Sequence, residues 1–223
     1  SPIFYLLIVH TLLIVYAAFY MSTRWWGFIS GVLLYILLGI YFAVPLLLGI
    51  VRRRRSSSQE WFDVVDPEGR VIGQATRQAC HSNRNLLHPV VHLHVLDGNH
   101  RLYLQKRSPA KEIQPDKWDT AVGGHIQRGE SVESALKREA EEELGLIRFP
   151  IIPLIRYVMT SPIESELVYV FKTHYHDEIS VNPDEISEGR FWEMEEIQAR
   201  LEEDLFTPNF RQEFKMLMEL NLL

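Results

Sequence analysis

GHIQRGESVESALKREAEEELGL, residues 124–146, reads as a loop that leads into one acidic helix. From Ser131 to Leu144 the stretch has no proline or glycine, and most of its residues are good helix formers. Ser131 is a suitable N-cap, Glu133 suits the positive end of the helix dipole, and Gly145 is a suitable residue to end the helix. We therefore expect a helix here, with the rest of the folded domain as its support.

The side of this helix that we expect to be buried changes from apolar to acidic along its length. Val132 and Leu136 lie at helical spacing, and the same sector then carries Glu139 and Glu143, with Glu142 beside them. Carboxylates spaced at i, i+3 and i+4 repel one another and are costly to bury without a cation, and Mg²⁺ prefers oxygen ligands. The alternative is a solvated charge run, which is the usual role of a Glu-rich helix.

These glutamates belong to a longer pattern. It runs Gly, five residues, Glu, seven residues, Arg-Glu-apolar, one residue, Glu-Glu, one residue, and Gly-apolar. Its positions are Gly124, Glu130, Arg138, Glu139, Ala140, Glu142, Glu143, Gly145 and Leu146. The complete pattern resembles the Nudix box. The resemblance implies a Nudix-type α/β/α sandwich with a mixed sheet, and metal-dependent cleavage of a diphosphate joined to another group.

The same resemblance implies roles for single residues. Glu139, Glu142 and Glu143 would hold Mg²⁺ or Mn²⁺, Arg138 would orient them, and Gly124 would lie at the substrate. A divalent ion on the diphosphate neutralises oxygen charge, polarises phosphorus and activates the attacking water. Which carboxylate would act as the general base stays open.

Charge is unevenly distributed along the chain. The net charge of the 223 residues is −6, but residues 1–55 contain five arginines and no acidic residue, which leaves −11 for residues 56–223. An acidic domain argues against nucleic acid as a partner, since that needs a basic face, and it still allows a small-molecule diphosphate bound through metal. Cys80 is the single cysteine, which excludes an intrachain disulfide and fits a reducing compartment.

Two long uncharged runs precede the acidic domain. Residues 3–21 and 27–51 are each long enough to span a bilayer as a helix, and Arg24 with two tryptophans suits an interfacial turn between them. Four arginines at 52–55 place the following domain in the cytoplasm by the positive-inside rule. We therefore expect a transmembrane helical hairpin over residues 1–55, the bilayer as a partner, and a two-pass membrane protein. A cleaved signal peptide is the weaker alternative.

Residues 56–223 have the pattern of one α/β domain. Turn-rich tetrads at 66–69 and 97–100 predict two β-hairpins. The expected strands are 61–65, 70–76, 89–96, 101–106, 118–122, 151–159, 166–173 and 190–194, and the expected closing helices are 195–201 and 210–220.

The domain further resembles the branch of this superfamily that contains the isopentenyl-diphosphate isomerases. Three histidines and two glutamates match the residues with which the isomerases bind a divalent metal: His81, His88, His125, Glu164 and Glu166. Arg107 and Lys111 match a basic pair that serves the diphosphate there. The resemblance implies a second divalent metal, and imidazole with carboxylate suits Zn²⁺ or Mn²⁺. Taken singly, these histidines and basic residues are ordinary surface or capping residues, and His92 and His94 match no ligand position.

The chain departs from the isomerases at two positions. Gly123 replaces the acid/base cysteine two residues before His125, and Asn209 lies near the position of a tryptophan that faces the prenyl carbocation. We therefore expect a hydrolase that cleaves the diphosphate linkage of a nucleoside or prenyl diphosphate derivative. The alternatives are an isomerase with an unusual acid/base group and a non-catalytic diphosphate-binding module tethered to the membrane.

Overall fold

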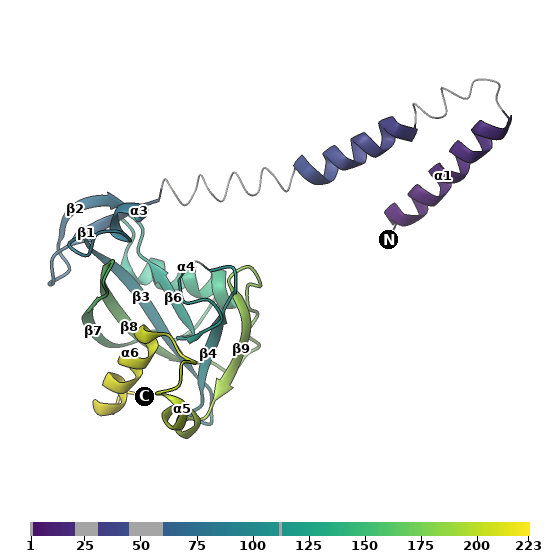
Figure 1. Cartoon of the computed structure of the whole chain (residues 1–223). Helices are drawn as coiled ribbons and strands as arrows, with labels where there is room; N and C mark the ends of the chain where they lie inside the picture. The colour runs from purple at the N-terminus through teal and green to yellow at the C-terminus, as the bar shows by residue number, and fades with distance from the viewer. Residues whose placement is uncertain (1, 21–30, 45–59, 112) are drawn as a thin grey trace. The chain divides into compact units, whose positions relative to one another are not determined.

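A computed structural model describes residues 2–20, 31–44, 60–111 and 113–223. The chain divides into two compact units, Ser1–Ser57 and Ser58–Leu223. In the first unit the structure describes α1 (Pro2–Tyr20) and a helix over residues 31–44 (Figure 1).

The expected membrane hairpin is not supported. Among the described helices, none combines the length and the apolar character needed to cross a bilayer. The prediction of a two-pass membrane protein with a cytoplasmic domain is therefore wrong. The expected turn at residues 22–26 and the arginines at 52–55 lie outside the described residues.

The second unit is a mixed α/β domain. Its strands are β1 (Trp61–Val65), β2 (Val71–Thr76), β3 (Leu87–Leu96), β4 (Leu102–Arg107), β5 (Trp118–Asp119), β6 (Val122–His125), β7 (Ile152–Thr160), β8 (Ser165–His174) and β9 (Ile186–Trp192). Its helices are α3 (Arg77–Cys80), α4 (Val132–Leu144), α5 (Met194–Arg200) and α6 (Pro208–Glu219). The short α3 is the helix that the sequence pattern missed.

The main sheet has the order β5-β4-β3-β8-β7, with β6 also paired to β3 and β9 to β4. β3 and β8 run parallel, and the other pairs are antiparallel. The two expected hairpins are confirmed as β1-β2 and β3-β4. β3 lies in the middle of the sheet and carries residues of both faces, so it is the strand on which the site is built.

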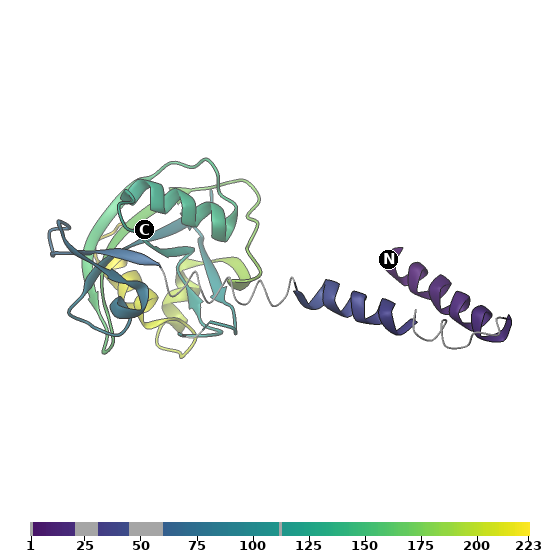
Figure 2. The ribbon, with the colours of Figure 1, turned by 90° about the horizontal axis from the view of Figure 1, so that it is seen from above.

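The sheet is covered on both faces, as expected for an α/β/α sandwich (Figure 2). Val91 and Leu93 of β3 point to the face where α4 packs, and they share a buried cluster with Leu136. Val90 points to the opposite face and packs in a cluster with Leu217 of α6. Alternate residues of one strand therefore support the box helix on one side and α6 on the other.

The box helix forms where it was predicted. Ser131 accepts a hydrogen bond from the Ser134 N–H, and Gly145 ends the helix in the left-handed conformation at φ 69°. In that conformation the Leu146 N–H reaches the Ala140 carbonyl at 3.1 Å. A residue with a Cβ is strained at such a φ, which explains the glycine.

The expected strand 118–122 is wrong as one element. Trp118 pairs with Lys106 of β4, whereas Val122 pairs with Leu93 of β3. The chain therefore changes its strand partner between β5 and β6, and the Thr120 N–H turns to the Asp119 carboxylate at 2.9 Å. Local propensity cannot show this change, because it depends on which strand lies opposite.

Candidate active site and metal centre

Arg138 of α4 ties the start of the box to its acidic end. Its Nε and Nη2 donate to the two carboxylate oxygens of Glu130 at 3.0 and 2.9 Å. Its Nη1 donates to Glu139 at 2.7 Å and to Glu142 at 3.3 Å, and Nη2 also donates to the His125 carbonyl at 3.0 Å. One guanidinium therefore sets the positions of three carboxylates and of the last residue of β6.

Glu139 lies against the backbone of β6. A Cβ added at Gly124 would overlap the Glu139 carboxyl group, so only a glycine leaves room for this carboxylate. Burial raises the pKa of Glu139 to about 7, against the opposing effect of the Arg138 charge. A bound cation would stabilise the ionised form of this carboxyl group, which burial disfavours.

Glu143 is the most deeply buried of the box acids, with 6% of its surface exposed. Its Oε2 accepts hydrogen bonds from Gln105 Nε2 at 2.9 Å and from the Gly123 N–H at 3.4 Å. Burial, together with the Glu139 charge, raises its pKa to about 8. Its Oε1 has no hydrogen-bond partner within the described parts of the chain, and it is available to a metal ion or a water molecule.

Glu142 is placed differently from its two neighbours. Its side chain is 58% exposed, and its contact in this site is the ion pair with Arg138. The three carboxylates therefore do not point to one spot in this structure: Glu139 and Glu143 face the sheet, and Glu142 lies at the rim.

Both residues of the expected basic pair, Arg107 and Lys111, already have acidic partners. Lys111 Nζ donates to Glu185 at 2.9 Å, and Arg107 Nη1 lies 3.4 Å from Asp119. The Glu185 charge raises the pKa of both Glu139 and Glu143, so this residue belongs to the same electrostatic cluster. Sequence reasoning missed Glu185 and Gln105 because they lie outside the box and no local pattern marks them.

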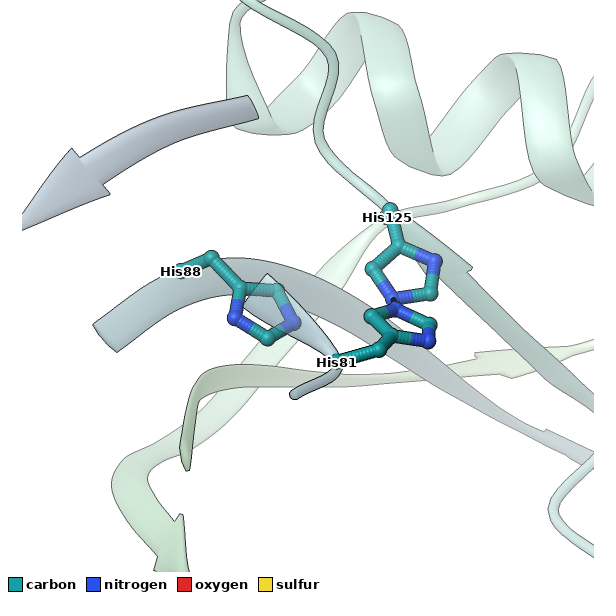
Figure 3. A group of neighbouring side chains, drawn as sticks. All are labelled: His81, His88 and His125. Atoms are coloured by element: carbon teal, nitrogen blue, oxygen red, sulfur yellow. Dashed lines mark hydrogen bonds between the residues drawn. The ribbon is translucent and has the colours of Figure 1, made fainter. Parts of the chain in front are cut away.

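The three expected histidines converge from three elements (Figure 3). His81 follows α3, His88 is the second residue of β3 and His125 ends β6. The His81 and His125 Nε2 atoms are 2.9 Å apart. Burial lowers the pKa of His81 to about 4 and that of His125 well below its usual value, so both rings are neutral at pH 7 and offer lone pairs.

His88 and the two glutamates complete a second donor set. The His88 Nδ1 donates to the Leu86 carbonyl at 3.2 Å, which leaves the Nε2 with a lone pair. That Nε2 and the Glu164 Oε2 are buried without a hydrogen-bond partner in the described residues. Ligand atoms of His88, Glu164 and Glu166 lie within 4.8 Å of one another, as do those of His88 with the other two histidines. Neutral imidazoles and half-buried carboxylates fit a divalent ion.

His125 connects the two donor sets. Its carbonyl accepts a hydrogen bond from Arg138 of the box. Its ring stacks on Phe62, with ring centroids 4.6 Å apart, and lies beside His81 at 4.9 Å. The residues expected from the two resemblances therefore lie in adjoining places around the end of β6.

The positions that depart from the isomerases are also part of this region. Gly123 presents an exposed backbone beside Glu143, and Asn209 donates to Glu166 at 3.4 Å. Cys80 is buried in the cluster around Phe62, away from position 123.

Comparison with known proteins agrees with this architecture. The family model described as NUDIX domain matches residues 86–214. The Nudix hydrolase YfcD of Escherichia coli K12 is 31% identical over 171 residues, which cover 77% of this chain and 93% of that protein. A Nudix hydrolase of Yersinia pestis is 32% identical over 160 residues, which cover 72% of this chain and 86% of that protein.

Two further matches concern the isomerases and the fold. An isopentenyl-diphosphate delta-isomerase of Citrobacter koseri is 30% identical over 144 residues, covering 62% of this chain and 80% of that protein. The crystal structure of DR0079 from Deinococcus radiodurans has a TM-score of 0.62 at 27% identity, covering 70% of this chain and 98% of that one.

Proposed function

This chain belongs to the Nudix domain family, and on that premise we propose that it is a metal-dependent hydrolase of a diphosphate linkage in a nucleoside or prenyl diphosphate derivative. The observation that carries the proposal is the pair Glu139 and Glu143, two buried carboxylates of one helix whose pKa values burial raises to about 7 and about 8. Buried carboxylates of this kind are stabilised by a bound cation, and oxygen ligands suit Mg²⁺ or Mn²⁺.

The proposed ligands of the first ion are Glu139 and Glu143, with Glu142 reaching it from the rim. His81, His88, His125, Glu164 and Glu166 are the proposed ligands of a second divalent ion. The bound ions supply the charge that neutralises the diphosphate oxygens and activates water. The chain itself orients the donors: Arg138 fixes Glu139, and Gln105 fixes Glu143.

Arg107 and Lys111 are the proposed contacts to the diphosphate. Their present partners are Asp119 and Glu185, and a phosphate oxygen would replace these carboxylates as the acceptor. The charge of Lys111 already lowers the pKa of Glu143, which supports its place near the reacting phosphates. Gly124 would contribute by keeping the Glu139 carboxyl group close to β6.

The isomerase alternative needs an acid/base group where this chain has Gly123. A glycine has no titratable side chain, so proton transfer at that position would lack its donor. The observation that favours this alternative is that the histidine and glutamate donors that match those of the isomerases lie together around His88.

The experiment uses the full chain with Mg²⁺ or Mn²⁺ and follows isopentenyl diphosphate and a panel of nucleoside diphosphate derivatives by phosphorus NMR. We expect a monophosphate product, and a loss of its formation of at least about 100-fold in Glu143→Gln. Glu141→Gln is the matched control, because Glu141 lies on the same helix with an exposed side chain. Equal rates in both variants would refute the assignment of Glu143, and binding without turnover would favour a binding module.

A further inference from the structure

The ring of His92 in β3 lies next to Gly123, which is an exposed position beside the box. His92 is paired in register with Gly123 of β6, and Gly123 is exposed although it lies within a strand. A Cβ added at Gly123 would lie 3.6 Å from the His92 Cδ2 and 3.7 Å from its Nε2. These are ordinary contact distances, so a ligand atom above Gly123 would meet the edge of this ring.

A buried carboxylate holds that ring in one orientation. Glu213 of α6 is fully buried and accepts three hydrogen bonds: from His92 Nδ1 at 2.8 Å, from His94 Nε2 at 2.7 Å and from the Tyr157 hydroxyl at 2.8 Å. A carboxylate with three donors is ionised. The bond to Nδ1 therefore leaves the His92 Nε2 facing Gly123, and this atom has no hydrogen-bond partner among the residues that the structure describes.

The groups around His92 make it a donor. Burial opposes its protonation, but Glu213, with Glu166 of β8 and Asp119 of β5, raises the pKa of His92 to about 9. Tyr157 of β7 and His94 also face this cluster through Glu213. At pH 7 the Nε2 therefore carries a hydrogen atom, and it can bond only with an acceptor.

This donor adjoins the box across one strand. The Gly123 N–H points to the Glu143 carboxylate and thus away from β3. Among the described strands β6 pairs with β3 alone, and side chains of α4 lie along its other edge in place of a further strand. A group that is attached to a diphosphate at Glu143 would leave the box over Gly123 and reach the His92 Nε2.

We propose that the His92 Nε2 donates a hydrogen bond to an oxygen of the group that adjoins the diphosphate, so that the substrate is a nucleoside or sugar diphosphate derivative and not a prenyl diphosphate. The inference rests on the proposed function for the position of the diphosphate. A hydrocarbon chain over Gly123 would remove water from a charged donor and return no acceptor, which is the unfavourable arrangement. His92 is then a specificity-determining contact.

The test compares two ligands and two variants of the full chain by calorimetric titration in Mg²⁺. The ligands are α,β-methylene-ADP, a nucleoside diphosphate that resists cleavage, and methylenediphosphonate, which has the same bridge and no nucleoside. The variants are His92→Gln and His94→Gln. Each replaces one imidazole donor to Glu213 by an amide, but His94 is fully buried and is not among the nearest neighbours of a Cβ at Gly123, so His94→Gln reports the structural cost alone.

We expect His92→Gln to weaken the binding of α,β-methylene-ADP at least about tenfold more than His94→Gln does, because the charged hydrogen bond to the ligand is lost. Methylenediphosphonate should bind equally to both variants. The histidine ring ¹⁵N spectrum of the wild type should show a shift of the His92 Nε2 signal with α,β-methylene-ADP. Equal weakening in the two variants with an unmoved signal would overturn the inference while leaving the proposed function intact. Failure of methylenediphosphonate to bind would refute the proposed function.

Discussion

Gly124→Ala tests how closely the box carboxylates depend on the strand beneath them. The added Cβ overlaps the Glu139 carboxyl group, so this side chain has to leave its place and its hydrogen bond to Arg138 at 2.7 Å. Both partners are at most one quarter exposed, and loss of such a charged bond costs about 1–2 kcal/mol after allowance for solvent screening. Because the displaced group is a proposed ligand, we expect Mn²⁺ to bind about 10–100-fold more weakly.

The assay is an electron paramagnetic resonance titration of the full chain with Mn²⁺, with urea unfolding as a measure of stability. Gly73→Ala is the matched control: its Cβ would meet Val64 at 3.9 Å, which is ordinary contact, in a hairpin outside the box. Glu139→Gln and the double variant should bind Mn²⁺ as weakly as Gly124→Ala, since all three remove the same ligand. Wild-type affinity in Gly124→Ala, or additive losses in the double variant, would show that the added Cβ does not act by displacing the Glu139 ligand.

Three further predictions concern the buried charges and the histidine centre. The pKa of His92 is about 9 in the folded protein, which exceeds its unfolded value of about 6.5. Its contribution of about 3 kcal/mol to the free energy of unfolding is therefore complete below about pH 6.5 and is lost as the pH rises to about 9. The pKa of Glu213 is lowered by His92 and His94 despite burial, so its contribution is lost as the pH falls below about 4.5. Urea unfolding should therefore show a loss of stability above pH 6.5 that is smaller in His92→Gln than in the wild type, because the raised pKa values of Glu139 and Glu143 contribute to this loss in both proteins. An equal loss in the two proteins would contradict the assignment to His92. Glu213→Gln should lower the free energy of unfolding by about 3–5 kcal/mol. Glu219→Gln, at an exposed position of the same helix, should lower it by no more than about 0.5 kcal/mol. Similar values for the two variants would show that the three hydrogen bonds to Glu213 contribute little to stability. Zn²⁺ should raise the melting temperature of the wild type and of the exposed control His176→Gln but not that of His88→Gln, and a rise in His88→Gln would exclude His88 as a ligand.

The box helix could be predicted from sequence because its causes are local. Helix formers, the Ser131 cap and the left-handed Gly145 all act within a few residues, and they set the helix before any tertiary contact. The spacing also predicted that Glu139 and Glu143 lie on the side that faces the sheet. It could not predict that Glu142 points outward at the rim.

What the sequence could not show depends on partners distant in the chain. Glu213 lies 121 residues from His92, and no periodicity joins them. Glu185 lies just before β9 and pairs with Lys111, which is 74 residues earlier in the chain. The division between β5 and β6 follows from a change of neighbouring strand. The membrane prediction failed for a different reason: hydropathy measures the length of an uncharged run, whereas spanning requires one apolar helix of sufficient length.

In the proposed reaction water attacks phosphorus at the box carboxylates, and phosphorus NMR of the reaction in half-enriched ¹⁸O water shows whether it does. The full chain would be incubated with Mg²⁺ and a nucleoside diphosphate sugar, with isopentenyl diphosphate in a parallel sample. We expect two monophosphate products from the nucleoside diphosphate sugar, one of them with a signal split by ¹⁸O, because the new oxygen on the attacked phosphorus comes from water. Conversion of isopentenyl diphosphate to its dimethylallyl isomer, with both phosphorus signals retained and no monophosphate from either substrate, would contradict the proposed reaction.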